Sequence, residues 1–110
     1  MTTPLHELKA EFFRTLGHPA RIRVLELLAD GERSVGELQP DVGLEPSHLS
    51  QQLGVLRRAG VLISRKQGTT VFYSLASPLI ADLMAAARAV LTEMLSDRMG
   101  LLDDLREDPR

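Results

Sequence analysis

The chain has 110 residues, of which 44% are hydrophobic and 25% charged, and its net charge is −2. These values predict one globular domain spanning residues 1–110, and the lack of cysteine excludes disulfides and zinc–thiolate sites. No apolar run approaches the roughly 18 residues that span a bilayer. The N-terminal segment is amphipathic and contains acidic residues, unlike a signal peptide, so we expect a cytoplasmic protein.

The charges are unevenly distributed along the chain. Residues 46–81 contain four basic residues and no acidic residue, a charge of +4. The remaining residues contain nine basic and fifteen acidic side chains, a charge of −6. A basic segment within an acidic protein is typical of a surface that contacts nucleic acid.

Four prolines mark the starts of four predicted helices. Pro4, Pro19, Pro46 and Pro78 each precede an apolar periodic segment. Proline suits the first helical turn, where its missing N–H would be unpaired anyway. The four segments predict helices over about residues 4–16, 19–29, 46–59 and 78–105.

Two further features predict helix caps. Ser34 and Glu37 have the spacing of a capping box, in which each side chain satisfies a backbone N–H of the other residue. They predict a short helix between Gly31 and Pro46 that is closed by residues 40–43. His18 stands immediately before a proline, where it is most simply explained as an N-cap.

The period of the apolar residues changes after Gly60. Residues 61–66 and 70–75 are rich in β-branched and aromatic side chains, and a three-residue loop containing Gly68 separates them. This pattern predicts a β-hairpin. The predicted fold is therefore mainly α with a small β-hairpin, in the order α-α-α-α-β-β-α.

The predicted helix over residues 46–59 has one apolar stripe, formed by Leu49, Leu53 and Leu56, while its other long side chains are mostly polar or basic. A short helix joined by a tight turn to such a helix is a helix-turn-helix, here residues 34–59. The hairpin over residues 61–75 would then be a wing. Because the base edges of the DNA major groove offer donors and acceptors to a helix, the sequence predicts sequence-specific binding of double-stranded DNA.

Four stretches of the chain, covering about residues 8–76, resemble one known family. They are LGHPARIRVLELL, SVGELQ, SHLSQQLGVLRRAGVL and RKQGTTVFYSL, and they resemble the ArsR/SmtB family of winged helix-turn-helix repressors. The resemblance implies a dimeric bacterial transcriptional repressor. Many such proteins release operator DNA when an inducer binds, and the inducer is often a metal ion.

The resemblance also implies roles for individual residues. The side chains that would face the major groove are Ser47, His48, Ser50 and Gln51, with Gln52 at the margin of this set. Arg57 would lie near the DNA backbone at the end of the helix. The wing residues that would approach phosphates or the minor groove are Arg65, Lys66, Gln67, Gly68 and Thr69.

The predicted first and last helices, residues 4–16 and 78–105, have wide apolar stripes. We expect them to form an isologous homodimer, whose operator would be an imperfect inverted repeat. The residues predicted at this interface are Leu8, Phe12 and Leu16 of one subunit and Leu83, Val90 and Met94 of the other. The alternative is that the same stripes only complete the core of the monomer.

The sequence departs from the best-known family members in the residues that sense the inducer. Their metal sites use cysteines, or Asp and His pairs along the last helix, whereas this chain has no cysteine and no histidine after His48. We therefore expect no metal site and no cofactor. An unidentified small-molecule inducer, a partner protein or no effector at all remain open.

Two other classes of function fit the sequence less well than DNA binding. An enzyme is not expected, because the chain has no cysteine nucleophile, no glycine-rich phosphate loop and no metal-ligand spacing, and its three histidines lie in separate predicted elements. The other alternative is a winged-helix module that binds proteins without binding DNA. The absence of acidic residues from 46 to 81 argues against this alternative.

Overall fold

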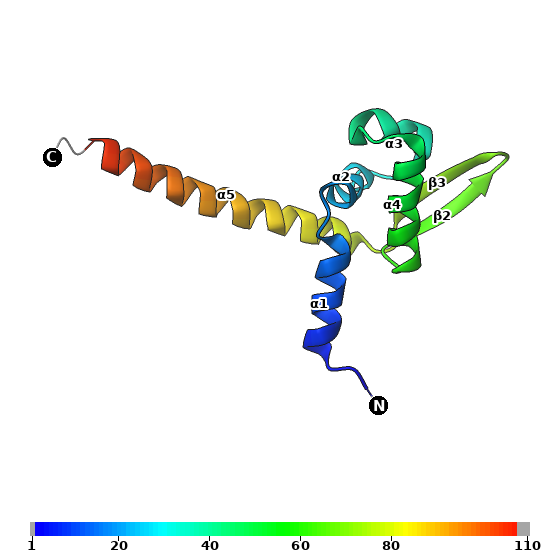
Figure 1. Ribbon diagram of the computed structural model, residues 1–110, viewed down its shortest axis with the longest axis horizontal. Helices are drawn as coiled ribbons and strands as arrows, with labels where there is room; N and C mark the ends of the chain where they lie inside the picture. Colours follow the sequence, from blue (N-terminus) through cyan, green and yellow to red (C-terminus); the bar gives the residue numbers. More distant parts are fainter. Residues whose placement is uncertain (1, 108–110) are drawn as a thin grey trace.

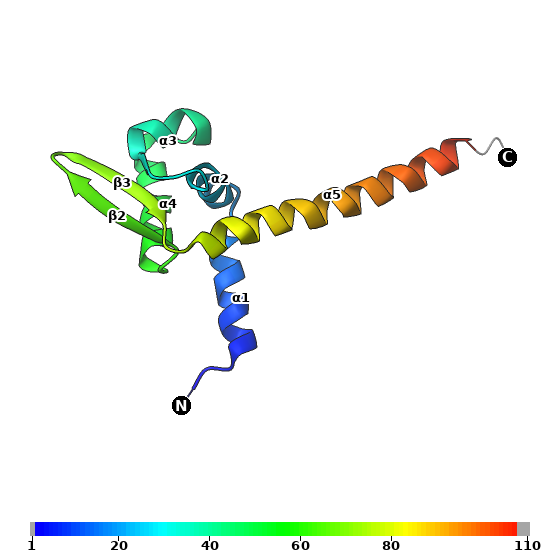
Figure 2. The ribbon, with the colours of Figure 1, turned by 180° about the vertical axis from the view of Figure 1, so that it is seen from behind.

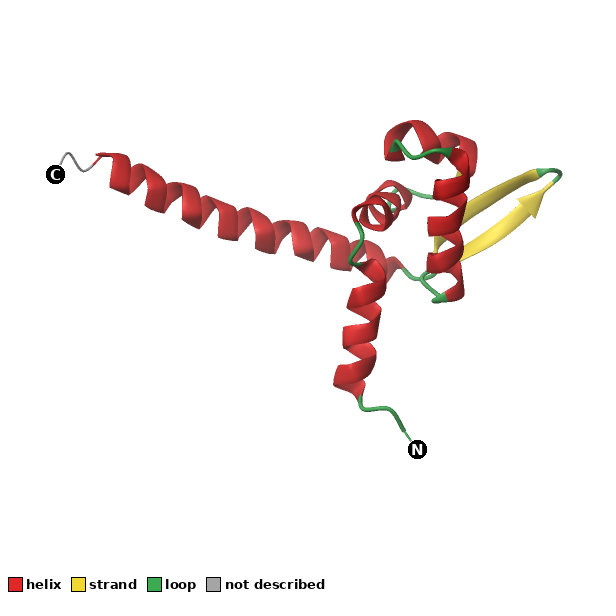
Figure 3. Cartoon of the chain, viewed as in Figure 1, coloured by secondary structure: helices red, strands yellow, loops and turns green. Residues whose placement is uncertain are grey.

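The computed structural model describes residues 2–107, with side chains described through residue 100. This part of the chain forms five helices and one small antiparallel sheet (Figure 3). The elements are α1 (Leu5–Leu16), α2 (Pro19–Leu28), β1 (Arg33–Ser34), α3 (Val35–Val42), α4 (Pro46–Arg58), β2 (Leu62–Gln67), β3 (Thr70–Leu75) and α5 (Pro78–Glu107). The winged-helix fold and the order of the predicted elements are confirmed, and β1 is an addition.

The predicted caps are present at the starts of α2 and α3. The His18 ring accepts a hydrogen bond from the Ala20 N–H at 3.1 Å. The Ser34 hydroxyl accepts from the Glu37 N–H at 3.2 Å, and the Glu37 carboxylate accepts from the Ser34 N–H at 3.0 Å. This reciprocal pair satisfies two backbone donors that the first turn of α3 would otherwise leave without a partner.

Helix α3 ends within the segment predicted to close it. Pro40 lies inside it, and the helix ends only at Gly43, whose φ of 79° is left-handed. The Gly43 N–H donates to the carbonyl of Gln39 at 2.9 Å, which closes the last turn. Proline removes one helical N–H donor, and α3 continues past Pro40 without it, so residues 40–42 of the segment predicted to close the helix form its last turn and Gly43 caps it.

The sheet differs from the predicted hairpin in two respects. Its strand order is β1-β3-β2, because the two residues of β1 pair with Tyr73 and Phe72 of β3. Gln67 pairs directly with Thr70, so the connection is a two-residue turn rather than the predicted three-residue loop. Gly68 stands first in this turn with φ of 63°, as a type II′ turn requires.

The core of the domain is built almost entirely from leucine and valine. Leu49, Leu53 and Leu56 of α4 are completely buried in it, which holds the opposite side of α4 outward. The full set of buried core residues is Leu16, Val24, Leu25, Leu27, Leu28, Leu38, Leu49, Leu53, Leu56, Val61, Leu62 and Ile80.

Two helices project from this core in different directions. Figures 1 and 2 show α1 and the distal part of α5 extending away from the body that α2, α3, α4 and the hairpin form. The radius of gyration is 18.1 Å, whereas a compact domain of this size has about 13 Å. No helix within residues 2–107 is both long enough and apolar enough to cross a membrane.

Candidate nucleic-acid interface

The outward face of α4 is polar and exposed. Ser47 and Gln51 lie one helical turn apart on the side opposite the buried leucines, and both are exposed, as is the neighbouring His48. The helix has no acidic residue in its first turn, and Arg57 and Arg58 occupy its last turn. The predicted base-reading residues therefore include three that solvent, and hence DNA, can reach.

Ser50 lies at the side of α4 that faces the wing. An open groove of about 490 Å³ brings this exposed residue together with Ser34, Val35 and Gly36 and with the wing residues 69–71. Ser50 and Thr69, both predicted as DNA-binding residues, thus line one surface. The start of α3, the middle of α4 and the turn of the wing meet there.

Gln52 differs from the neighbouring Gln51 in being half-buried and bonded within the chain. Arg21 of α2 donates from Nε to the Gln52 Oε1 at 2.7 Å. The Nη1 of Arg21 also donates to the carbonyl of Thr15, at the end of α1, at 2.9 Å. This contact could not be predicted from a local sequence pattern, because Arg21 and Gln52 lie 31 positions apart in the chain.

Arg65 of the wing is fully engaged with other residues. It donates from Nε and Nη2 to the two carboxylate oxygens of Glu32, at 3.1 and 2.6 Å, and from Nη1 to Gln67 at 2.8 Å. Its guanidinium also lies 4.7 Å from the centre of the Phe72 ring. Arg65 was predicted to contact a phosphate. To do so it must either break these bonds or bind the phosphate while its positive charge is already neutralised by Glu32.

This ion pair affects both titrating groups. Hydrogen bonding from Arg65 holds the pKa of the Glu32 carboxyl below its usual value, and attraction between the two charges adds to this effect. Hydrogen bonding to Glu32 correspondingly raises the pKa of Arg65. Glu32 is thus a carboxylate at neutral pH, and it sits beside the wing as a competitor for any anion that approaches Arg65.

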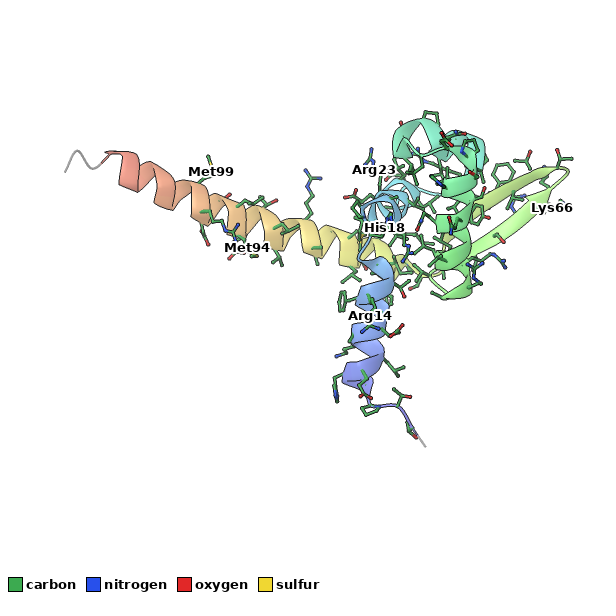
Figure 4. The ribbon with its side chains drawn as sticks, in the orientation of Figure 1. Arg14, His18, Arg23, Lys66, Met94 and Met99 are labelled. Atoms are coloured by element: carbon green, nitrogen blue, oxygen red, sulfur yellow. The ribbon has the colours of Figure 1, made fainter. Side chains whose placement is uncertain are left out.

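Lys66 is the other cation of the wing, and it is exposed. Its strand neighbour across the hairpin is Val71, whereas Arg65 pairs with Phe72, so the two cations lie on opposite faces of the sheet. Lys66 takes part in none of the ion pairs among the described residues. Figure 4 shows it on the projecting hairpin, away from the helical body.

Arg58 lies on the outward face of α4 and was not among the residues predicted to contact DNA. A Cβ built on Gly54 would meet the Nη1 of Arg58 at 3.0 Å, so the guanidinium lies over this glycine. Gly54 is in turn next to Gln51 along the helix face. Gln51, Gly54 and Arg58 are spaced at i, i+3 and i+7, and this spacing could have identified Arg58 as part of the outward face of α4.

The residues predicted at a dimer interface divide into two groups. Leu8, Val90 and Met94 are 46–55% exposed and are free to contact a second subunit. Leu16 is only 2% exposed, because it packs in the core of its own chain, so its assignment to the interface was wrong. The half-buried pair Phe12 and Leu83 also pack against that core.

Other exposed apolar residues were missed on the same two helices. The missed residues on α1 are Leu5 and Phe13; on α5, Leu79 is exposed at the start of the helix, and Leu91, Leu95 and Met99 are exposed farther along it. These last three continue the exposed stripe of Val90 and Met94, far out along the projecting part of the helix, where Figure 4 labels Met94 and Met99. Within the described residues, no group of three or more His, Asp and Glu side chains gathers as metal ligands would.

Sequence comparison relates the chain to bacterial regulators. The family model for "Bacterial regulatory protein, arsR family" matches residues 18–64. A protein of Mycobacterium tuberculosis, the uncharacterized HTH-type transcriptional regulator Rv0081, is 64% identical over 104 residues, which are 94% of this chain and 91% of that protein. The biofilm growth-associated repressor of Agrobacterium fabrum is 44% identical over 81 residues, 74% of this chain and 69% of that protein.

Solved structures agree with this relationship. The crystal structure of Rv0081 matches with a TM-score of 0.81 over 89% of this chain and 99% of that one. The homodimeric winged helix-turn-helix DNA-binding domain of Mb0332 from Mycobacterium bovis is 30% identical, with a TM-score of 0.75 over 84% of this chain and 86% of that one. With its helix-turn-helix, its wing and these relatives, the chain belongs to the ArsR family of winged helix-turn-helix transcriptional regulators.

Proposed function

We propose that the chain represses transcription as a homodimer that binds an inverted-repeat operator in duplex DNA. The observation that supports this proposal most directly is the outward face of α4. Three fully buried leucines fix that face outward, and it lies in a segment, residues 46–81, with no acidic residue. Acidic side chains there would be repelled by the two rows of phosphates that flank a groove.

The proposed division of labour follows from side-chain chemistry. Ser47, His48 and Gln51 would bond to base edges, because amides, hydroxyls and imidazoles match the donors and acceptors of the major groove. Arg57, Arg58, Lys66 and residues 67–69 would contact the phosphate backbone, which sets register without reading sequence.

Dimerisation is proposed through α1 and α5. Leu8, Val90 and Met94 are exposed in the monomer, and the similar Mb0332 domain is described as homodimeric. A twofold dimer would present its two copies of α4 to half-sites about one helical turn apart, roughly 34–36 Å. The winged-helix module that binds only proteins is disfavoured by the family to which the chain belongs.

The remaining expectations concern the setting of this function. A repressor of this kind would act in the bacterial cytoplasm, without enzymatic activity, and an unidentified small molecule could release it from DNA. The inducer would be sought by screening metabolites and divalent ions for release of a bound operator fragment.

The proposal is tested by selecting bound fragments from random duplex DNA and measuring affinity for the selected site at several salt concentrations. We expect an inverted repeat, and a fall of log K with log salt whose slope is about −0.9 for each phosphate contacted. A scrambled duplex of the same length serves as the control. The absence of any DNA binding, or an affinity that is independent of salt, would reject the proposal.

A further inference from the structure

Arg21 joins three helices at one side of the proposed recognition helix. Its Nε donates to the Gln52 Oε1 of α4 at 2.7 Å, and its Nη1 donates to the carbonyl of Thr15 in α1 at 2.9 Å. Because the guanidinium is anchored from both sides, it defines where the Gln52 amide lies. Arg21 and Gln52 are both half-buried.

The direction of the bond fixes which end of the amide is available. An arginine N–H can only donate, so the Gln52 atom that faces Arg21 must be its oxygen. No hydrogen bond among the described residues uses the Gln52 Nε2, and no described buried side-chain nitrogen or oxygen lacks a partner. The NH2 group of Gln52 therefore keeps some exposure to solvent.

We infer that Arg21 is a positioning residue that makes Gln52 a hydrogen-bond donor to DNA and prevents it from recognising adenine. A glutamine recognises adenine through its oxygen and nitrogen side by side, accepting from N6 and donating to N7. Here the oxygen is turned towards α2, so this bidentate contact cannot form. Guanine presents two acceptors in the major groove, O6 and N7, so it matches a group that can only donate better than adenine, whose N7 acceptor lies beside the N6 donor.

This inference rests on the proposed function and makes it more specific. Gln51, one position earlier, has no such partner among the described residues and is exposed. It can turn its amide freely and form the bidentate contact with adenine. The two adjacent glutamines of α4 would thus have different base preferences, and the difference would arise from an arginine that touches no DNA.

The first experiment compares base preferences of four forms of the full chain by selection from random duplex DNA. Gln52→Ala identifies the base pair that Gln52 faces, as the position whose preference is lost. At that position the wild-type chain should prefer guanine over adenine, and Arg21→Ala should reduce this ratio by about fivefold or more. Arg23→Ala is the matched control, because Arg23 is exposed on the same helix and its ion pair is with Glu26, at 3.7 Å.

A purely structural role of Arg21 would give a different result. It would weaken binding to all sequences alike and leave the guanine-to-adenine ratio unchanged, which would overturn the inference. The inference also fails if Gln52→Ala alters no base preference. A wild-type chain that binds no DNA would reject the proposed function itself, whereas binding with unaltered preferences rejects only the inference.

A second measurement does not depend on the folding of the Arg21 variant. Nuclear magnetic resonance relaxation of the wild-type side-chain amides should show Gln52 restrained and Gln51 mobile on the picosecond to nanosecond timescale. Equal mobility of the two amides would show that Arg21 does not hold Gln52, and would overturn the inference.

Discussion

At the scale of single residues, the proposed contact between Gln51 and a base can be tested directly. It is exposed and points away from the buried leucines of α4. We expect Gln51→Ala to weaken binding to the selected operator by about 1–3 kcal/mol, and to leave binding to a scrambled duplex unchanged. Fluorescence anisotropy titrations with the two duplexes measure both values. An equal loss on both duplexes would mean that Gln51 contacts only the backbone.

The two cations of the wing should differ in their contribution to DNA binding. Lys66→Ala should flatten the slope of log K against log salt by about one unit, because this exposed side chain has no partner in the ion pairs described above. Arg65→Ala should change the slope less, since Glu32 already neutralises that guanidinium. Salt titrations of both variants test this order. A larger effect of Arg65→Ala would mean that DNA displaces Glu32.

Gly54 offers a prediction in which stability and binding change in opposite directions. Alanine at this position should stabilise α4 by up to about 1 kcal/mol, since glycine is a poor helix former. The added Cβ would stand 3.0 Å from the Nη1 of Arg58 and would displace that guanidinium. We therefore expect Gly54→Ala to raise Tm while weakening DNA binding. A rise in both Tm and DNA affinity would show that DNA binding does not require the Arg58 guanidinium to lie over Gly54.

At the scale of elements, the cap of α3 should make the fold sensitive to acid. Hydrogen bonds from the backbone N–H and then the hydroxyl of Ser34 hold the pKa of Glu37 below its usual value. Because the folded-state pKa is the lower one, this stabilisation is complete above about pH 4.3, the ordinary value for glutamate. It is lost as the pH falls through the folded-state value.

The cap is tested by measuring Tm between pH 3 and pH 7. The loss of Tm on acidification should be smaller in Glu37→Gln than in the wild-type chain, because glutamine does not titrate. Glu93→Gln, on the polar side of α5, leaves the capping box intact and serves as the control. Identical acid profiles of wild type and Glu37→Gln would show that the cap contributes nothing to this dependence.

The elements that could be predicted from sequence are those with local signals. Prolines and the Ser34–Glu37 spacing located the helix starts, because capping chemistry acts within one turn. Strand β1 has only two residues, too few to show an alternation of apolar and polar side chains, so the sequence did not predict its pairing with β3. The bonds that define Gln52 and Arg65 join residues 31 and 33 positions apart, and only the folded chain brings them together.

Helix periodicity also limits what can be said of an interface. Leu8, Phe12 and Leu16 share one stripe of α1, but the stripe turns from solvent at Leu8 to the core at Leu16. Sequence pattern alone does not distinguish a face that contacts a partner from one that completes the monomer. The exposed Phe13 and the half-buried Phe12 lie edge to face, with their ring centres 5.6 Å apart. The solvent-facing and core-facing sides of α1 are therefore in direct contact at this point.

At the scale of the whole molecule, the projecting part of α5 should hold two subunits together. Met94 is 46% exposed there, and an aspartate at this position would bury an unpaired charge in an apolar interface. We expect Met94→Asp to sediment as a monomer and the wild-type chain as a dimer. Ser96→Asp, on the other side of the same helix, should remain dimeric. A dimeric Met94→Asp variant would place the interface elsewhere.

Ser34 belongs to two structures at once, because it pairs with Phe72 of β3 and caps α3. The wing is therefore attached at its base to the start of the helix-turn-helix. Exchanging wings between related regulators would have to include residues 32–34 along with the hairpin. A graft of residues 61–75 alone would pair this hairpin with the third strand of the recipient and would separate Arg65 from the Glu32 carboxylate.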